Sequence, residues 1–379
     1  MKIGILTYHR SHNYGAFLQA YSLSNALNKI DGVDCELIDY NLCKEENVYK
    51  TRIWKRPIYF LQYYRQDKMF KEQRKEQLLS KDEILSDDYK AVLDYANNKY
   101  DIVVVGSDEI WRIASRGFPN AYWLPGKYSF KKMSYAASGR NSNTVFTEDV
   151  KNKMREFYGD FCYIGVRDEI TKRQVEELGI DININRNCDP SFLYPKYNKN
   201  KIELRNKICE KYKINANKKI IAIAYDRVDV ITKLRKLLGK NYEFICITRP
   251  MWNANKNLCS ITPFEWVDII GGSDYLITSY FHGMLFAVNQ NTPFIAIDRR
   301  ANRDNLKSSK LYDFLEYSNM QDRYNIASEL NEEEFQKISI KIKEEIKKTI
   351  DFGDIVNSQI ALFENFYRVI EEIKNERKG

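Results

Sequence analysis

The segment Leu276–Asp298 constrains the fold more than any other stretch of the chain. Two short apolar runs, at 276–278 and 294–297, flank a helix-like run at 284–288, which predicts a strand, a helix and a second strand. His282, one of three histidines in the sequence, lies where the first strand gives way to the helix. Ligands bind at this edge in open α/β sheets, and histidine is well suited to proton transfer near neutral pH. We therefore expect the chemistry here.

The same alternation of strands and helices occurs along most of the chain. In the first half we expect strands at 3–8, 35–40, 101–105, 133–137 and 161–166, with helices at 16–27 and 169–178. After a polar stretch at 196–201 the pattern restarts, with strands at 219–225 and 242–248 and helices at 230–238 and 264–270. Such alternation is typical of parallel sheets covered by helices.

The fold class that follows is α/β, with two Rossmann-like domains facing a cleft. We expect the domains at residues 1–195 and 196–330, and C-terminal helices at 331–379 that pack across both. Loops from two parallel sheets on the sides of one cleft suit transfer between two bound substrates. The pattern therefore predicts a two-domain group-transfer enzyme.

Composition excludes several other classes. No apolar span reaches the ~20 residues needed to cross a bilayer, and no leader precedes the first strand, so we expect a cytoplasmic protein. The seven cysteines are scattered, with no CxxC pair and no Cys/His cluster at zinc-ligand spacing. We expect them to be reduced, and we expect no metal.

Positive charge is concentrated in one segment. Residues 50–75 carry nine basic and two acidic side chains, a local +7 that nearly equals the net +8 of the whole chain, and they are interleaved with aromatic residues. This basic aromatic excursion, at about 44–95, could make a peripheral contact with an anionic membrane or hold an acidic partner. The alternative is a helical excursion whose aromatics are core. Nucleic acid is not expected, because no nucleic-acid-binding motif accompanies the patch.

The first strand–helix loop supplies candidate binding residues. Gly15 allows close backbone approach, and the following helix N-terminus favours an anion. His9, His12 and Asn13 precede it and could line the cleft. The loop has neither a GxGxxG motif nor a phosphate-binding-loop lysine, which disfavours a dinucleotide or P-loop site. Asn13 could instead cap the helix, and the histidines could be ordinary loop residues.

The loop after the 101–105 strand contains Gly106, Ser107, Asp108 and Trp111. The Asp108 carboxylate could orient a sugar hydroxyl or act as a base, and Trp111 could stack on a sugar ring, since the loop lies at the carboxyl end of a strand that we expect to be parallel. The alternative is a helix N-cap beside a core tryptophan.

Three arginines each follow a predicted strand directly, namely Arg140, Arg167 and Arg227. A guanidinium presents a planar fork to a carboxylate or phosphate, so we expect at least one of them to act as an anion clamp. Each could alternatively be a surface salt-bridge partner.

Six motifs in order resemble the polysaccharide pyruvyl transferase family of bacteria. They are ILTYHRSHNYGAFLQAYSL, VVVGSDEIW, SYAASGR, VRD, DPSFL and TSYFHGMLFAVNQNTPFIAID, and they span roughly Met1 to Asp298. The resemblance implies a GT-B-like fold, phosphoenolpyruvate as donor, and as acceptor a sugar of a cell-surface polysaccharide, free or lipid-linked. It implies no cofactor beyond phosphoenolpyruvate as co-substrate. The product would be a pyruvate ketal, with the acceptor on the N-terminal domain and the donor on the C-terminal domain.

The resemblance also assigns site residues. His282 matches the family's donor-site histidine, as acid or phosphate contact, with Ser279 and Gly283 beside it and Asp108 as a second catalytic candidate. Many members have an arginine beside the phenylalanine-histidine pair, as in SRFHG, where this chain has Tyr280. The guanidinium must then come from elsewhere, and the candidates are Arg227, Arg249 and Arg299. The loop NYGA likewise replaces NxGD.

Two other functions stay open from the sequence. One is a GT-B-type glycosyltransferase that uses a nucleotide sugar, although no DxD motif is present. The other is a non-catalytic, membrane-peripheral protein of glycan assembly, which would use the 50–75 segment as its contact.

Overall fold

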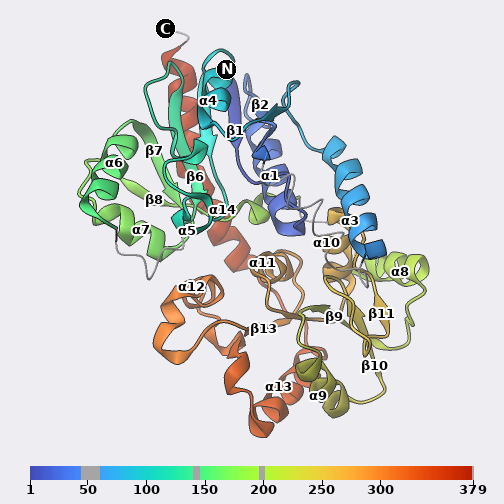
Figure 1. Ribbon diagram of the computed structural model, residues 1–379. Helices are drawn as coiled ribbons and strands as arrows, with labels where there is room; N and C mark the ends of the chain where they lie inside the picture. The colour runs from blue at the N-terminus through green and yellow to red at the C-terminus, as the bar shows by residue number, and fades with distance from the viewer. Residues whose placement is uncertain (44–59, 140–145, 196–200, 378–379) are drawn as a thin grey trace. The chain divides into compact units, whose positions relative to one another are not determined.

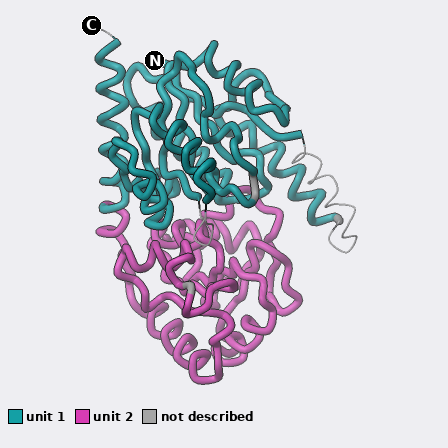
Figure 2. Tube along the Cα trace, turned by 60° about the vertical axis from the view of Figure 1, so that its left-hand side comes forward, with its two compact units in different colours: residues 1–194, 358–379 teal, residues 195–357 magenta. Residues whose placement is uncertain are grey.

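The computed structural model describes residues 1–43, 60–139, 146–195 and 201–377. These residues form two compact units (Figures 1 and 2). Unit 1 comprises Met1–Tyr194 and Ser358–Gly379, and unit 2 comprises Pro195–Asn357. The predicted boundary between 195 and 196 lies next to this division. The C-terminal segment 331–379 is shared between the units, because it changes from unit 2 to unit 1 at Ser358.

Unit 1 contains a six-stranded sheet in the order β2-β1-β5-β6-β7-β8, in which every pair is parallel. The strands are β1 Lys2–Leu6, β2 Asp34–Leu37, β5 Ile102–Val105, β6 Lys131–Ala137, β7 Phe161–Val166 and β8 Ile184–Arg186. All four residues of β5 are buried, as expected for an apolar central strand of a parallel sheet.

Unit 1 also contains seven described helices, most of which pack against this sheet, whereas α3 extends away from it (Figure 1). They are α1 Tyr14–Leu27, α3 Phe60–Gln73, α4 Tyr89–Asn97, α5 Ile113–Arg116, α6 Glu148–Tyr158, α7 Glu169–Glu176 and most of α14 Gly353–Glu376. A two-stranded sheet pairs β3 Tyr40–Asn41 with β4 Ile84–Leu85, and short 3-10 helices lie at Arg74–Glu76, Ala121–Trp123 and Pro190–Leu193. α14 packs on the sheet through Phe366, whose ring lies 4.8 Å from that of Tyr135 in β6.

Unit 2 repeats the plan with the strand order β11-β10-β9-β12-β13-β14, again all parallel. Its strands are β9 Lys219–Ala224, β10 Tyr242–Cys246, β11 Lys256–Asn257, β12 Tyr275–Thr278, β13 Phe294–Asp298 and β14 Tyr324–Ile326. Its helices are α8 Lys201–Tyr212, α9 Val228–Leu238, α10 Pro263–Gly272, α11 Phe281–Asn289, α12 Lys310–Tyr317 and α13 Glu332–Glu345, with 3-10 turns at Arg303–Ser308, Gln321–Arg323 and Ala327–Glu329. In the described parts of the chain, no helix is long and apolar enough to cross a membrane.

Local sequence explains where these helices begin. Thr262 and Glu265 form a capping box at the start of α10, with Pro263 as the first helical residue. Asp168 caps α7 by accepting a hydrogen bond from the Thr171 backbone N–H.

Each sheet has one point at which the strand order reverses. In unit 1 the chain runs from β1 outward to β2 and then returns to β5 on the other side of β1. In unit 2 it runs from β9 to β10 and β11 and then returns to β12 on the other side of β9. The crevice at the carboxyl ends of two such strands is the usual ligand position in open α/β sheets. The loops after β1 and β5, and those after β9 and β12, are therefore the places to look for a site.

Candidate functional site

In unit 1, the loops after β1 and β5 lie against each other. The Thr7 hydroxyl donates to the Ser107 carbonyl at 3.2 Å, and the Tyr8 hydroxyl donates to the Glu109 carbonyl at 3.3 Å. Gly106 has a φ of +121°, and a Cβ there would lie 2.1 Å from the Tyr135 carbonyl oxygen, so only glycine fits. Ser107 is fully buried, and its Oγ has no hydrogen-bond partner among the described residues. Gly106 and Ser107 thus lie at the carboxyl end of β5, at the edge of the sheet where the strand order reverses.

Asp108 keeps its carboxylate partly exposed at this edge, with 16% of the side chain accessible. Its Oδ1 accepts a hydrogen bond from the Glu109 backbone N–H and lies 3.8 Å from Nη2 of Arg167. A partly exposed carboxylate beside a guanidinium can still accept a hydrogen bond or a proton from a ligand hydroxyl.

Arg167 is buried rather than presented to a ligand, with 3% of its side chain exposed. Its Nη1 donates to Asp189 at 2.9 Å. Burial alone would lower its pKa, but the charges of Asp189 and Asp108 outweigh that and raise it. Arg167 therefore braces the loops after β5, β7 and β8. Of the two roles open to Arg167, it takes that of a salt-bridge partner, here a buried one, and not that of an anion clamp.

His9 is also buried, so the prediction that it lines the cleft is wrong. Its Nε2 lies 2.9 Å from the Asp39 carboxylate, which also receives two hydrogen bonds from Arg10 at 2.6 and 2.7 Å. Burial would raise the pKa of Asp39, but the hydrogen bonds and charges of His9 and Arg10 hold it well below its usual range. This cluster fixes the path of the loop after β1.

His12 faces the basic excursion. Its Nε2 lies 3.1 Å from Asp67 in α3, and its ring stacks on Phe70 at 5.4 Å with 4° between the planes. Asn13 takes the alternative role of helix cap, since its side chain accepts from the backbone N–H of Gly15 at 2.8 Å and from that of the next residue at 3.3 Å. Gly15 is buried in the first turn of α1. The loop is thus held by contacts of His12 with α3 and by hydrogen bonds of Asn13 with the start of α1.

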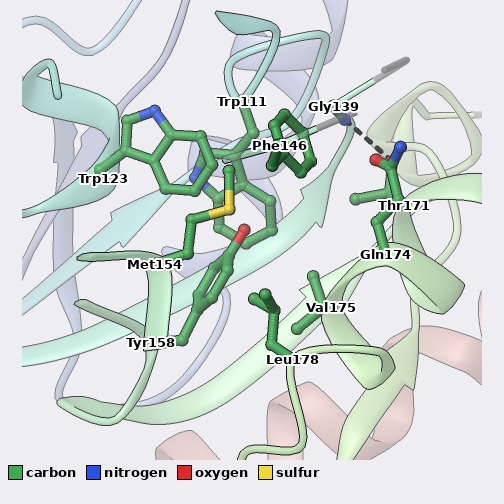
Figure 3. A pocket seen from close by; sticks show the side chains of 10 residues that line it. All are labelled: Trp111, Trp123, Gly139, Phe146, Met154, Tyr158, Thr171, Gln174, Val175 and Leu178. Carbon is green, nitrogen blue, oxygen red and sulfur yellow. Dashed lines mark hydrogen bonds between the residues drawn. The ribbon is translucent and has the colours of Figure 1, made fainter. Parts of the chain in front are cut away.

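Trp111 is a core residue, which corrects the prediction that it stacks on a sugar. It is 1% exposed, its Nε1 donates to the Tyr122 carbonyl at 2.9 Å, and its ring lies 5.7 Å from Trp123 and 5.0 Å from Tyr158. These rings line a small hollow, partly open to solvent, together with Met154 (Figure 3). Arg140, the remaining candidate of this half, lies outside the described residues.

In unit 2, β12 leads directly into α11 at the crevice. Tyr280 is the N-cap residue, and its side chain makes no capping bond; the first turn contains no acidic residue. The N-terminus of a helix that starts in this way favours a bound anion, because its dipole is positive at that end. Gly283 lets the first turn of α11 lie close to the end of β12, because a Cβ there would be 2.8 Å from the Thr278 hydroxyl.

His282 and Ser279 belong to this helix start. His282 is 7% exposed, and its ring lies 5.5 Å from that of Phe281. The Ser279 Oγ is buried and has no hydrogen-bond partner among the described residues. A hydroxyl in that state can bind an incoming ligand without breaking an existing bond.

Two of the three candidate arginines meet next to Tyr280. Arg299 and Arg249 both pair with the Asp226 carboxylate, the latter at 3.5 Å, and the Arg299 guanidinium lies 5.9 Å from the centre of the Tyr280 ring. Burial raises the pKa of Tyr280, and the charges of both arginines oppose this rise. Two cationic side chains therefore lie close to Tyr280. Arg227 instead pairs with Asp229 of its own helix, with Nε at 3.1 Å.

Asp226 is the site residue that sequence reasoning missed. It lies two residues after the end of β9, and polar residues close after β5 and β7 were already candidates, so its place near a strand end was the available signal. In the described ranges, no three His, Cys, Asp or Glu side chains are grouped so as to hold a metal ion.

Comparison with solved structures shows the fold. UDP-N-acetylglucosamine 2-epimerase of Rickettsia bellii has a TM-score of 0.55 at 11% identity, covering 98% of this chain and 96% of the epimerase. The corresponding epimerase of Methanocaldococcus jannaschii has a TM-score of 0.54 at 15% identity, covering 97% and 100%. Anabaena HepE in complex with UDP has a TM-score of 0.52 at 10% identity, covering 99% and 100%. The fold is of the GT-B type, as predicted.

The family comparison is more specific than these structural likenesses. No curated protein sequence matches the chain. The family model for polysaccharide pyruvyl transferase, however, matches residues 13–300, a range that includes the loops after β5, β9 and β12. The resemblance carried by the sequence motifs is thereby confirmed, and the chain belongs to the polysaccharide pyruvyl transferase family.

Proposed function

We propose that this protein transfers a pyruvyl group from phosphoenolpyruvate to a sugar of a cell-surface polysaccharide, or to its lipid-linked precursor, forming a ketal. The observation that carries the proposal is the arrangement at the crevice of unit 2. There, Arg249 and Arg299 lie beside an uncapped helix start that contains His282. Two cations beside a helix N-terminus fit a small ligand with both a carboxylate and a phosphate.

The reaction balances without a cofactor. A proton adds to the methylene carbon of the enol and gives a methyl group and an oxocarbenium-like centre. One sugar hydroxyl adds to that centre and loses its proton. The carbon–oxygen bond to phosphate then breaks, phosphate leaves with the bonding electrons, and the second hydroxyl closes the ketal and loses its proton. The steps require a proton donor, a proton acceptor and cationic stabilisation of the leaving phosphate.

The residues divide among these tasks. His282 supplies the proton or contacts the phosphate, and Ser279 adds a hydroxyl beside it. Arg249 and Arg299 bind the acidic groups of the donor, which replace Asp226 as their partner. Asp108 of unit 1 orients an acceptor hydroxyl or accepts its proton. Each group is of a type that performs its step in known enzymes.

Arginine variants test the donor site. We expect Arg299→Ala and Arg249→Ala each to raise the dissociation constant for phosphoenolpyruvate about 10- to 100-fold, the value of one lost hydrogen bond to a charged group. Arg227→Ala is the matched control and should change it less than about 3-fold, because Arg227 pairs with Asp229. Phosphoenolpyruvate-induced thermal shift and phosphate release with a panel of pyranosides provide the two measurements.

The same assays separate the alternatives. Stabilisation by a UDP- or GDP-sugar, with no effect of phosphoenolpyruvate, would indicate a glycosyltransferase instead. If neither a nucleotide sugar nor phosphoenolpyruvate stabilises the protein, and it binds membranes, the result would indicate a non-catalytic assembly protein. Equal losses in the Arg227 and Arg299 variants would contradict the assignment of the donor to this crevice.

α3 supports the proposed contact with an anionic membrane. Leu61 is 65% and Tyr64 is 54% exposed on this helix, next to exposed basic side chains, whereas Phe70 is buried on the other face. Exposed apolar and basic groups on one helix suit a lipid surface with negative charge. The part of the predicted segment before residue 60 lies outside the described residues.

Vesicle binding tests this contact. Replacing Arg65, Lys68 and Lys75 with glutamine should weaken binding to phosphatidylserine-containing vesicles about 100-fold, from roughly 1 kcal/mol for each charge. The matched control replaces three exposed lysines of unit 2, Lys337, Lys347 and Lys348. Cosedimentation at increasing salt provides the measurement. Equal loss in both triple variants would show that net charge, and not α3 with the 3-10 turn that follows it, controls binding.

A further inference from the structure

Trp252 is the most exposed large apolar side chain in the described parts of the chain. It is 82% exposed, whereas Trp111, Trp123 and Trp266 are 1, 1 and 2% exposed. Tryptophan is highly buried on average, so an almost fully solvated indole departs from the usual pattern. The other described tryptophans follow that pattern.

The loop that carries Trp252 is fixed on both sides of it. Met251 is 1% exposed, and it exchanges two hydrogen bonds with the Asn257 side chain, at 2.7 and 3.1 Å. The Asn253 side chain donates to the Thr232 hydroxyl at 2.7 Å and to the Val228 carbonyl at 3.3 Å. The backbone of Trp252 is therefore held between two anchored neighbours, and the exposure of its indole is not the result of a loose loop.

Trp252 also belongs to the edge of unit 2 that carries the donor cluster. Its loop leaves the carboxyl end of β10, the strand next to β9. Arg249, in the same loop, pairs with Asp226 at the carboxyl end of β9. Asn253 is bonded to the first residue of α9, directly after Arg227. The indole thus lies on a rigid support that also holds one of the cations of the site.

The surroundings of Trp252 favour a sugar over a lipid surface. The other exposed large apolar side chains of unit 2 in its described ranges are Ile202, Tyr317 and Ile340, and they lie on α8, α12 and α13. The loop itself supplies Arg249, whose side chain is 60% exposed, and the half-buried Asn255. Membrane contact requires a broader apolar face, whereas one aromatic ring among hydrogen-bonding groups suits a pyranose, which has an apolar C–H face and a polar rim.

We propose that Trp252 is a stacking platform for a pyranose ring of the acceptor glycan, and that it forms a sugar subsite next to the donor cluster. This inference rests on the proposed function, because it assigns part of the acceptor to unit 2. It also moves the predicted sugar-stacking role from Trp111 to a tryptophan that the solvent can reach.

Fluorescence tests sugar binding without turnover. In a Trp54→Phe background, which removes the tryptophan outside the described residues, Trp252 is the exposed emitter. The probes are the methyl glycosides of galactose, glucose, mannose and N-acetylglucosamine, and their short oligomers. We expect at least one of these sugars to shift the Trp252 emission to shorter wavelength. That sugar should reduce acrylamide quenching at least about 2-fold, and Trp252→Phe should remove both effects. A shift produced by anionic vesicles and by none of these sugars would overturn the proposal in favour of a lipid contact.

Steady-state kinetics supply the second test. Trp252→Ala should raise the KM for the acceptor about 10-fold, with kcat and the KM for phosphoenolpyruvate within about 2-fold, and Trp252→Phe should restore most of the loss. Tyr317→Ala is the control, at an aromatic residue on α12 that is 45% exposed, and it should leave kcat and both KM values unchanged. An active Trp252→Ala enzyme with an unchanged acceptor KM would overturn the subsite and leave the proposed function intact. Wild-type protein that binds a sugar at Trp252 without ketal formation would support the subsite and contradict the proposed function.

Discussion

A Gly106→Ala variant is expected to lose about 3–5 kcal/mol of the stability of unit 1 and all measurable transfer activity. The φ of +121° at this residue lies in a region that is essentially restricted to glycine and that costs other residues about 1–3 kcal/mol. In addition, the new methyl group would lie 2.1 Å from the Tyr135 carbonyl oxygen, an atom of the central sheet that cannot move aside by a change of rotamer. Overpacking of this kind costs a further 1–3 kcal/mol or so.

Calorimetry should show a fall of about 10 °C in the transition of unit 1, since 1 kcal/mol corresponds to roughly 2–4 °C in a domain of this size. Gly117→Ala is the matched control. Gly117 also has a positive φ, of +75°, but a Cβ there would have no atom within 4 Å. The control should therefore show only backbone strain, about 1–3 kcal/mol. A similar fall in both variants would mean that the clash with Tyr135 is relieved by movement of the loop.

The regular framework was predictable because local sequence determines it. The strand at Phe161–Val166 was predicted with the bounds that it has, and the strand at 101–105 differs by one residue from β5. Both are apolar runs bounded by polar residues, a signal that needs no tertiary information. The C-terminal helices were less predictable. Ile346 and Ile350 continue the helical spacing, but α13 ends at Glu345, and Phe352 packs instead on Phe294 of β13.

The errors at the site have a common physical cause, which is that each involves a partner distant in sequence. His9 looked available because its partner Asp39 follows a different strand. Trp111 looked like a loop aromatic because Trp123 and Tyr158, which bury it, lie on separate elements. Sequence alone could not show that Arg249 and Arg299 converge, because their meeting at Asp226 depends on the order β10-β9-β12-β13.

A His282→Ala variant is expected to lower kcat about 10²- to 10⁴-fold, the usual range for loss of a general acid. The fold should not change, because the residue is in the first turn of α11 and alanine is a good helix former. Arg249, Arg299 and the helix start remain, so phosphoenolpyruvate should still stabilise the protein against heat. His12→Ala is the matched control; it removes the contact with Asp67 of α3, which lies in unit 1, and should leave kcat within a few-fold of wild type.

His282→Gln distinguishes the two roles that remain for this residue. Glutamine can donate a hydrogen bond to a phosphate oxygen, but it cannot deliver a proton near neutral pH. If His282 is the acid, the glutamine variant should be as slow as the alanine variant, and single-turnover experiments in deuterium oxide should show slow deuteration of the new methyl group in both. Recovery of most of the activity by glutamine would make His282 a phosphate contact. The proton would then have to come from another group at the crevice, and the buried hydroxyl of Ser279 and the Tyr280 phenol beside the two arginines are the nearest candidates along the chain.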